Sequence, residues 1–145
     1  MPSRYLKENL LTSDAYDRLT EAEESMWTRL LLAVDDFGRF DGRAVVVRAR
    51  CYPLKADLEA AEVERRLDGL ARAGLIIRYA DDDKPYIQLT KWTLTPRAEH
   101  SKYPKPHANN RKDDAPQWVR EQLHAPREHL NADTPDLRSS ITVVD

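Results

Sequence analysis

The clearest pattern of hydrophobic and polar positions lies in residues 62–92, EVERRLDGLARAGLIIRYADDDKPYIQLTKW. Apolar residues recur there about one helical turn apart, at Val63, Leu67, Leu70 and Leu75. This spacing places one apolar stripe along one face of a helix. Gly74 predicts the end of that helix, because a residue without a Cβ readily adopts the left-handed conformation of a C-terminal cap.

After this glycine the pattern changes to that of two strands, at residues 75–79 and 86–90, with the polar sequence DDDKP as the turn between them. A helix that ends in glycine and leads straight into a short hairpin is typical of the second half of a winged helix. Such domains bind nucleic acids more often than not, and others dock onto proteins. The sequence therefore predicts a mainly α fold with a small β-hairpin (α+β), a winged helix-turn-helix.

A first long helix is predicted at residues 21–36 and is expected to end before Gly38. Thr20 is a good N-cap, and Glu23 three residues later completes a capping box. Before this helix we expect an extended lead-in and then a short helical turn up to residue 19. The buried face of the first helix should share one core with the third helix and the hairpin, formed by Trp27, Leu30, Leu31, Val34, Leu67, Leu70 and Leu75.

The segment between these two helices is ambiguous from local signals. Residues 39–40 favour a very short strand, and Asp41-Gly42 is a turn signal. In residues 43–52 the run AVVV has strand propensity, whereas the spacing of its apolar side chains and the stop at Pro53 fit a short helix. Because a three-helix core needs a second helix here, we predict a helix. The third helix is then expected from about Asp57 to Ala73.

After Trp92 the character of the chain changes. Residues 95–116 hold four prolines and almost no large aliphatic side chains, which predicts a linker or a disordered arm. The predicted organisation is a winged-helix domain at residues 1–100, a basic, proline-rich linker at 101–116, and a largely disordered tail at 117–145. Residues 117–124 of the tail have the apolar spacing of a short helix.

Six short strings now point to a known family. They are MPSRYLKENLLTSD, DDFGRFDGR, CYPLK, AGLIIRY, KPYIQL and SKYP, in that order within residues 1–104. Together they resemble the winged-helix N-terminal module of phage and prophage replication-initiator, or replisome-organiser, proteins. The resemblance implies DNA binding at replication initiation and recruitment of the host helicase machinery. It does not extend past residue 104, and a larger second domain present in some relatives has no expected counterpart.

Composition narrows the function classes. The formal net charge is only −2, so the chain as a whole is not basic. A single cysteine, Cys51, leaves no internal disulfide, zinc ribbon or CxxC redox motif. No apolar run approaches 18 residues and the N-terminus lacks a signal-peptide core, so we expect a cytoplasmic protein in a bacterial host cell, with no membrane partner.

Candidate DNA contacts fall on the third helix, around the second helix and on a basic arm. In a DNA-bound winged helix the helix before the hairpin enters the major groove and the wing touches phosphate. The third helix offers Arg65, Arg66 and Arg72 on its expected exposed face, and a competing interpretation makes them i,i+4 partners of surrounding carboxylates, including Glu62, Glu64 and Asp68. The wing carries Asp81, Asp82 and Asp83, which suit a basic protein surface better than phosphate.

The other candidate cations lie elsewhere. Arg39, Arg43, Arg48 and Arg50 surround the second helix, which in this fold lies across the DNA backbone. The arm, residues 91–112, has a net charge of +5, so the rest of the chain carries −7. Such an arm can neutralise phosphates without fixed geometry, although basic linkers also serve solubility alone. Its cations are Lys91, Arg97, Lys102, Lys105, Arg111 and Lys112.

Catalysis finds little support in the sequence. Asp35 and Asp36 are adjacent and are expected to mark a helix end, and the four histidines lack zinc-site spacing. There is no GxxxxGK[ST] loop, and Cys51 is expected to be a small buried hydrophobe. Trp27 and Trp92 are expected to pack rather than to stack on bases. We predict no catalytic residue, metal or cofactor.

The sequence thus favours a non-enzymatic protein that binds double-stranded DNA in phage replication initiation. Two alternatives stay open: a winged helix that docks onto helicase or helicase loader with little DNA affinity, and a phage transcriptional regulator. The partners consistent with these functions are double-stranded DNA, the host replicative helicase or its loader, and a further copy of the chain.

Overall fold

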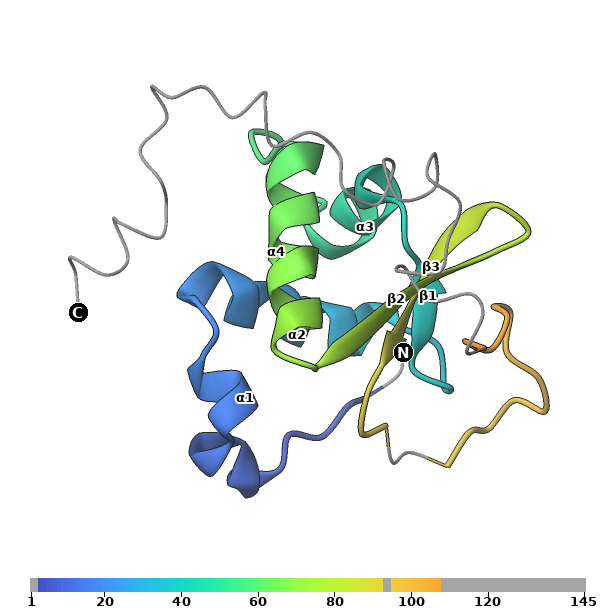
Figure 1. Ribbon diagram of the computed structural model, residues 1–145, viewed down its shortest axis with the longest axis horizontal. Helices are drawn as coiled ribbons and strands as arrows, with labels where there is room; N and C mark the ends of the chain where they lie inside the picture. The colour runs from blue at the N-terminus through green and yellow to red at the C-terminus, as the bar shows by residue number, and fades with distance from the viewer. Residues whose placement is uncertain (1–2, 93–94, 108–145) are drawn as a thin grey trace.

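The computed structural model describes residues 3–92 and 95–107. Figure 1 shows the helices gathered on one side of the strands, with the hairpin β2–β3 projecting away from them. The elements follow the order predicted for a winged helix. They are η1 (Glu8–Thr12), α1 (Asp14–Asp17), α2 (Glu21–Ala33), β1 (Arg39–Asp41), α3 (Ala44–Cys51), α4 (Ala60–Arg72), β2 (Ile76–Asp81) and β3 (Lys84–Leu89).

The three strands form one antiparallel sheet in the order β1-β3-β2. The short strand expected at residues 39–40 is confirmed as β1, and Phe40 lies opposite Ile87 of β3. In the hairpin, Tyr79 lies opposite Tyr86. Three helices followed by a hairpin, with β1 as the third strand, make this a winged helix-turn-helix of the α+β class, as the sequence predicts.

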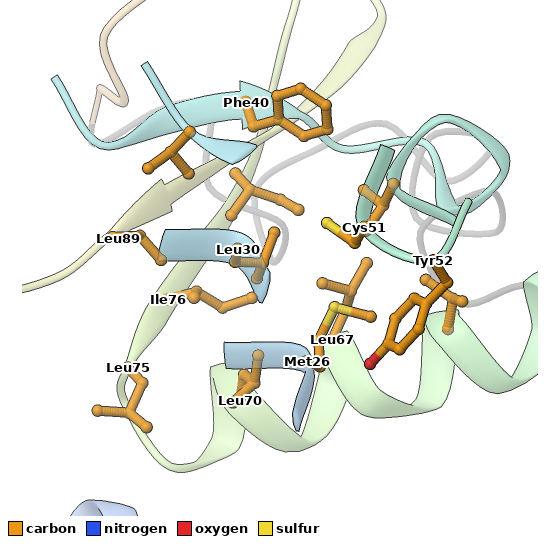
Figure 2. Close-up of a cluster of buried hydrophobic side chains, with 14 of the residues drawn as sticks. Met26, Leu30, Phe40, Cys51, Tyr52, Leu67, Leu70, Leu75, Ile76 and Leu89 are labelled. Atoms are coloured by element: carbon orange, nitrogen blue, oxygen red, sulfur yellow. The ribbon is translucent and has the colours of Figure 1, made fainter. Parts of the chain in front are cut away.

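The core lies between α2, α3, α4 and the inner face of the sheet. Figure 2 shows Met26 and Leu30 of α2 pointing towards Leu67 and Leu70 of α4, and all four side chains are fully buried. The seven predicted core residues belong to this cluster, five of them buried and Trp27 and Leu31 packed against it. Met26 was not among the predicted core residues.

The start of α2 matches its prediction and its end does not. Thr20 Oγ1 accepts from the Glu23 amide at 3.2 Å, and the Glu23 carboxylate accepts from the Thr20 amide at 3.0 Å. The helix ends at Ala33 rather than at residue 36. The reason is that Asp35 Oδ1 accepts from the amides of Phe37, at 2.9 Å, and Arg39, at 3.0 Å, which organises a turn instead of a further helical turn.

Residues 44–51 are a helix, which resolves the ambiguity in favour of the prediction. The third helix, α4, starts at Ala60 and not near Asp57. Arg48 of α3 explains the delay, because its guanidinium donates to the carbonyls of Ala56, at 2.8 Å, and of Leu58. Those carbonyls are therefore held in the loop by a side chain and do not begin a helix.

The hairpin is longer than the sequence suggested. Lys84 and Pro85 belong to β3, so the predicted five-residue turn is wrong and only Asp82 and Asp83 form the turn. Both have positive φ, 48° and 63°, which a two-residue hairpin turn of the favoured hand requires. The cap predicted at Gly74 is confirmed by its φ of 79°.

The core assignment is testable at Leu70. We expect Leu70→Ala to lower the free energy of unfolding by about 2–5 kcal/mol, because it leaves a cavity among fully buried side chains. Urea titration measures this. Leu54→Ala is the matched control, since Leu54 is 96% exposed and its truncation should change stability by less than about 0.5 kcal/mol. Equal effects of the two substitutions would contradict the helix face assigned here.

Candidate nucleic-acid interface

Two of the three candidate arginines on α4 are held by one carboxylate. Arg66 Nε lies 3.1 Å from Glu62 Oε1, and Arg65 Nη2 is ion-paired with Glu62 Oε2. Arg66 also donates to the Tyr52 hydroxyl at 3.0 Å. The interpretation of these arginines as partners of neighbouring carboxylates is therefore confirmed for both. Arg72, at the end of the helix, is exposed.

A buried ion-pair cluster joins α4 to β2, and the sequence analysis missed it. Arg78 of β2 contacts Glu64 Oε2 and Asp68 Oδ1, both at 2.9 Å. The side chains of Arg78, Glu64 and Asp68 are 1%, 3% and 8% exposed. The expectation that Glu64 and Asp68 lie on an exposed face is wrong. A signal was available: alternation along β2 places Arg78 on the same face as the core residue Ile76.

These contacts decide the electrostatics of α4. The helix carries three acidic side chains and three arginines, so its net charge is zero. All three carboxylates lie against guanidinium groups of α4 or β2. The surface that enters the major groove in a DNA-bound winged helix is thus neutralised within the domain.

The wing adds negative charge beside this neutral helix. Asp82, Asp83 and Lys84 are exposed, and Asp81 is half-buried. Three carboxylates therefore face one ammonium group at the tip of the hairpin. A phosphate backbone at this tip would be repelled, as the sequence predicts.

The four candidate arginines around α3 have different environments. Arg39 lies in β1, is 9% exposed, and donates to Gln88 at 2.8 Å. Arg43 is exposed but pairs with Asp41 at 2.7 Å. Arg48 fastens the loop before α4, as described above. Arg50 alone of these four is exposed with no ion pair among the described residues. The expected basic surface around α3 is therefore reduced to Arg50, with Arg43 held beside a carboxylate.

Part of the predicted arm is packed on the domain. We call residues 97–104 the strap. Asp36 Oδ2 accepts from the Arg97 amide at 3.1 Å, and Asp35 Oδ2 accepts from the Ser101 hydroxyl. At the far end of the strap, the Tyr79 hydroxyl donates to the Pro104 carbonyl at 2.6 Å. The packed part of the chain therefore extends beyond residue 100, where the sequence placed the domain boundary.

Aromatic rings hold the strap against the sheet. The Tyr103 ring lies 6.0 Å from that of Phe40 and 6.1 Å from that of Tyr86, and the Tyr79 and Tyr86 rings lie 5.7 Å apart. Arg39 reaches the Tyr103 carbonyl at 3.3 Å. Burial raises the pKa of all three tyrosine hydroxyls, which keeps them neutral hydrogen-bonding groups near neutral pH.

The cations of the arm that the structure describes all have exposed side chains. The side chains of Arg97, Lys102 and Lys105 are exposed, as is Lys91 at the base of the hairpin. Lys91 has a φ of 55°, an uncommon conformation for a residue with a side chain. Arg111, Lys112 and the helix predicted at 117–124 lie outside the described residues.

The two tryptophans and the Asp35-Asp36 pair, considered above as possible functional residues, all make contacts within the domain. The indole Nε1 of Trp92 donates to the Asp36 carbonyl at 2.7 Å, and the Arg4 guanidinium lies 5.4 Å from its ring centroid. Trp27 meets Tyr16 edge-on at 5.5 Å. Asp35 and Asp36 follow the end of α2 and bind the strap. Both tryptophans therefore pack within the domain, as expected.

Groups for acid–base, nucleophilic or metal chemistry are scarce. Cys51 is buried, and burial raises the pKa of its thiol from 9.0 to about 11. Over residues 3–92 and 95–107, no three His, Cys, Asp or Glu side chains gather so as to hold a metal ion. In the same part of the chain no helix has the length and apolar character needed to cross a bilayer.

Comparisons of the chain with protein-family models, with curated proteins and with solved structures found no match.

The buried cluster gives a stability prediction. Arg78→Met should lower the free energy of unfolding by about 3–5 kcal/mol, because it leaves Glu64 and Asp68 buried without their guanidinium partner. Thermal and urea unfolding measure this. The triple variant Arg78→Met/Glu64→Leu/Asp68→Leu should regain most of the loss, since apolar replacements of a buried ion pair are often neutral. If Arg78→Met had the stability of the wild-type protein, the buried ion-pair cluster would be contradicted.

Cys51 gives a pH prediction. Its pKa is raised on folding, so the unfolded chain loses the thiol proton at lower pH than the folded protein does. The associated stability is complete below pH 9 and is lost as the pH rises from 9 towards 11. Cys51→Ala should therefore show a shallower decline of stability over this range in urea titrations at successive pH values. Parallel declines for the two proteins would contradict a buried thiol.

Proposed function

We propose that this chain is a non-enzymatic DNA-binding protein that acts in the initiation of phage DNA replication. One observation carries the DNA-binding part: apart from Arg72 at the last position of α4, the exposed candidate cations without an ion pair among the described residues lie outside α4 and the wing, on α3, at the hairpin base and on the strap. The winged-helix fold and the six strings shared with replication-initiator modules support the replication part.

The proposed binding is electrostatic and reads no bases through α4. Arg65 and Arg66 are held by Glu62, so insertion of α4 into the major groove would have to break ion pairs inside the domain. Phosphate contact by an exposed cation has no such cost and supplies affinity through counterion release. In the described part of the chain, the exposed cations without an ion pair that belong to the predicted set are Arg50, Arg72, Lys91, Arg97 and Lys102.

A second function, docking onto helicase or helicase loader, is favoured by the wing. Asp82 and Asp83 are exposed at its tip beside a helix of zero net charge, which suits a basic protein surface. A role in transcription would use the same DNA contacts at a promoter. Mapping the bound site to an origin or to a promoter separates replication from transcription.

DNA titrations at several salt concentrations test where the affinity resides. Each phosphate contact contributes about −0.9 to the slope of log affinity against log salt. The arm variant Arg97→Gln/Lys102→Gln/Arg111→Gln/Lys112→Gln should flatten this slope by roughly 3–4 units. Fluorescence anisotropy with labelled duplex DNA measures the slope.

The matched control is Arg65→Gln/Arg66→Gln on α4. Because Glu62 already neutralises these arginines, the control should change the slope by less than about one unit. If the α4 variant changed the salt slope more than the arm variant, DNA would bind through α4 and not through the arm. If the wild-type protein did not bind DNA near physiological salt, the DNA-binding proposal would be rejected in favour of docking onto helicase or helicase loader.

A further inference from the structure

A groove lies at the opposite end of the hairpin from the acidic wing tip. The N-terminal segment, α1, α2 and the base of the hairpin enclose it, and its volume is about 880 Å³. In Figure 1 the N-terminal segment and α1 lie below the lower end of α4, where the hairpin begins. The apolar side chains that line the groove include Leu10, Trp27, Leu31, Leu75, Leu89 and Trp92.

Large apolar side chains also stand exposed beside this groove. Tyr5 and Leu6 line it and are 84% and 58% exposed, and Leu11, in the adjoining η1, is 84% exposed. These three are half of the large apolar side chains that the described residues expose. The domain therefore leaves uncovered apolar surface next to an apolar hollow, which is a mark of an interaction site.

The charges around the groove are mostly positive. Lys7, Arg18 and Lys91 line it and are exposed with no ion pair among the described residues, whereas Asp14 is its single acidic lining residue. Arg4 also lines it but is occupied, since it donates to the carbonyls of Leu31 and Val34 at 3.1 and 3.0 Å. The rim thus holds three available cations against one carboxylate.

We propose that this groove binds an acidic amphipathic segment of a partner protein. Large apolar side chains of the segment occupy the hollow between Trp27 and Trp92, and its carboxylates meet Lys7, Arg18 and Lys91. A DNA backbone matches the cations but offers no apolar groups to the hollow. Within the part of the chain that the structure describes, the three consecutive carboxylates Asp81 to Asp83 form a hairpin tip without large exposed apolar neighbours, so a second copy bound through this tip is a poor match.

The groove shares one cation, Lys91, with the set proposed to contact DNA, and the other cations of that set lie outside the groove lining. The strap packs on the sheet instead, where the Tyr79 hydroxyl donates to the Pro104 carbonyl and the Tyr103 ring lies against Phe40. A protein that binds DNA with the arm therefore keeps the groove available for a partner. The proposal does not depend on DNA binding and can fail or succeed without it.

Peptide titration of the full chain tests the proposal. The probe is a fluorescent peptide with Phe and Leu at positions i, i+3, i+4 and i+7 and glutamate elsewhere, and its control carries lysine in place of each glutamate. We expect saturable binding of the acidic peptide at least tenfold tighter than that of the basic one. The indole NMR signals of Trp27 and Trp92, assigned through Trp→Phe variants, should shift on binding.

Charge reversal locates the site. Lys7→Glu/Arg18→Glu should weaken binding of the acidic peptide about fivefold or more, from the loss of two exposed pairs. Arg50→Glu, on α3 and outside the groove, is the matched control and should leave it unchanged. Circular dichroism and thermal unfolding verify that each variant is folded.

Four outcomes would overturn the proposal. They are equal affinity for the two peptides, unchanged Trp27 and Trp92 signals at saturation, equal weakening by Arg50→Glu, and a fivefold loss of DNA affinity in Lys7→Glu/Arg18→Glu, which would assign the rim to DNA. Sedimentation equilibrium tests whether a second copy of the chain occupies the groove. A dimer that Leu6→Glu dissociates would show this and would also overturn the proposal, whereas a monomer supports it.

Discussion

The buried contact of Arg78 with Glu64 and Asp68 is the constraint on which the arrangement of helix and wing depends. Glu64 and Asp68 are one turn apart on α4, so both carboxylates reach one guanidinium on β2. Three buried charged groups are costly unless they satisfy each other, and this requirement fixes β2 against α4 at one register. The contact therefore couples β2 to α4 at Arg78, four residues before the wing tip at Asp82.

The same pairing shapes the outer electrostatics. Acidic residues that would repel DNA from α4 are neutralised inside the domain, but they occupy Arg65, Arg66 and Arg78 in doing so. What α4 presents is then a neutral helix beside an acidic wing tip. Exposed cations without an ion pair among the described residues remain at the groove rim, with Lys7, Arg18 and Lys91, and on the strap, with Arg97 and Lys102. The proposed nucleic-acid and protein surfaces therefore differ in their residues, with Lys91 common to both.

Features that depend on residues close together in the sequence were predicted correctly, and features that depend on contacts between distant elements were not. The helices, the Thr20–Glu23 capping box and the Gly74 cap depend on residues within a few positions of one another, so periodicity and local chemistry predicted them. Arg78 could not be paired from local spacing, because its partners belong to another element. The start of α4 was missed for a related reason, since the Arg48 side chain holds the loop from the preceding helix. The turn at Asp82-Asp83 was misjudged because Asp lacks the signal of Asn-Gly, although it tolerates the same conformation.

The strap is the clearest feature that the sequence did not predict, and it shows that part of the basic arm is packed on the domain. Its composition is that of a linker, and the contacts that order it join residues about sixty positions apart, such as Asp35 and Ser101. Asp35 and Asp36 look like a helix end or a catalytic pair in sequence, and their carboxylates instead receive a hydroxyl and an amide of the strap. Because hydrogen bonds hold the strap at Arg97, Ser101 and Pro104, the exposed side chains of Arg97 and Lys102 extend from a backbone that is packed on the domain. Under the proposed function, phosphates that contact these cations would meet them along a backbone path set by the domain, which a free tether could not provide.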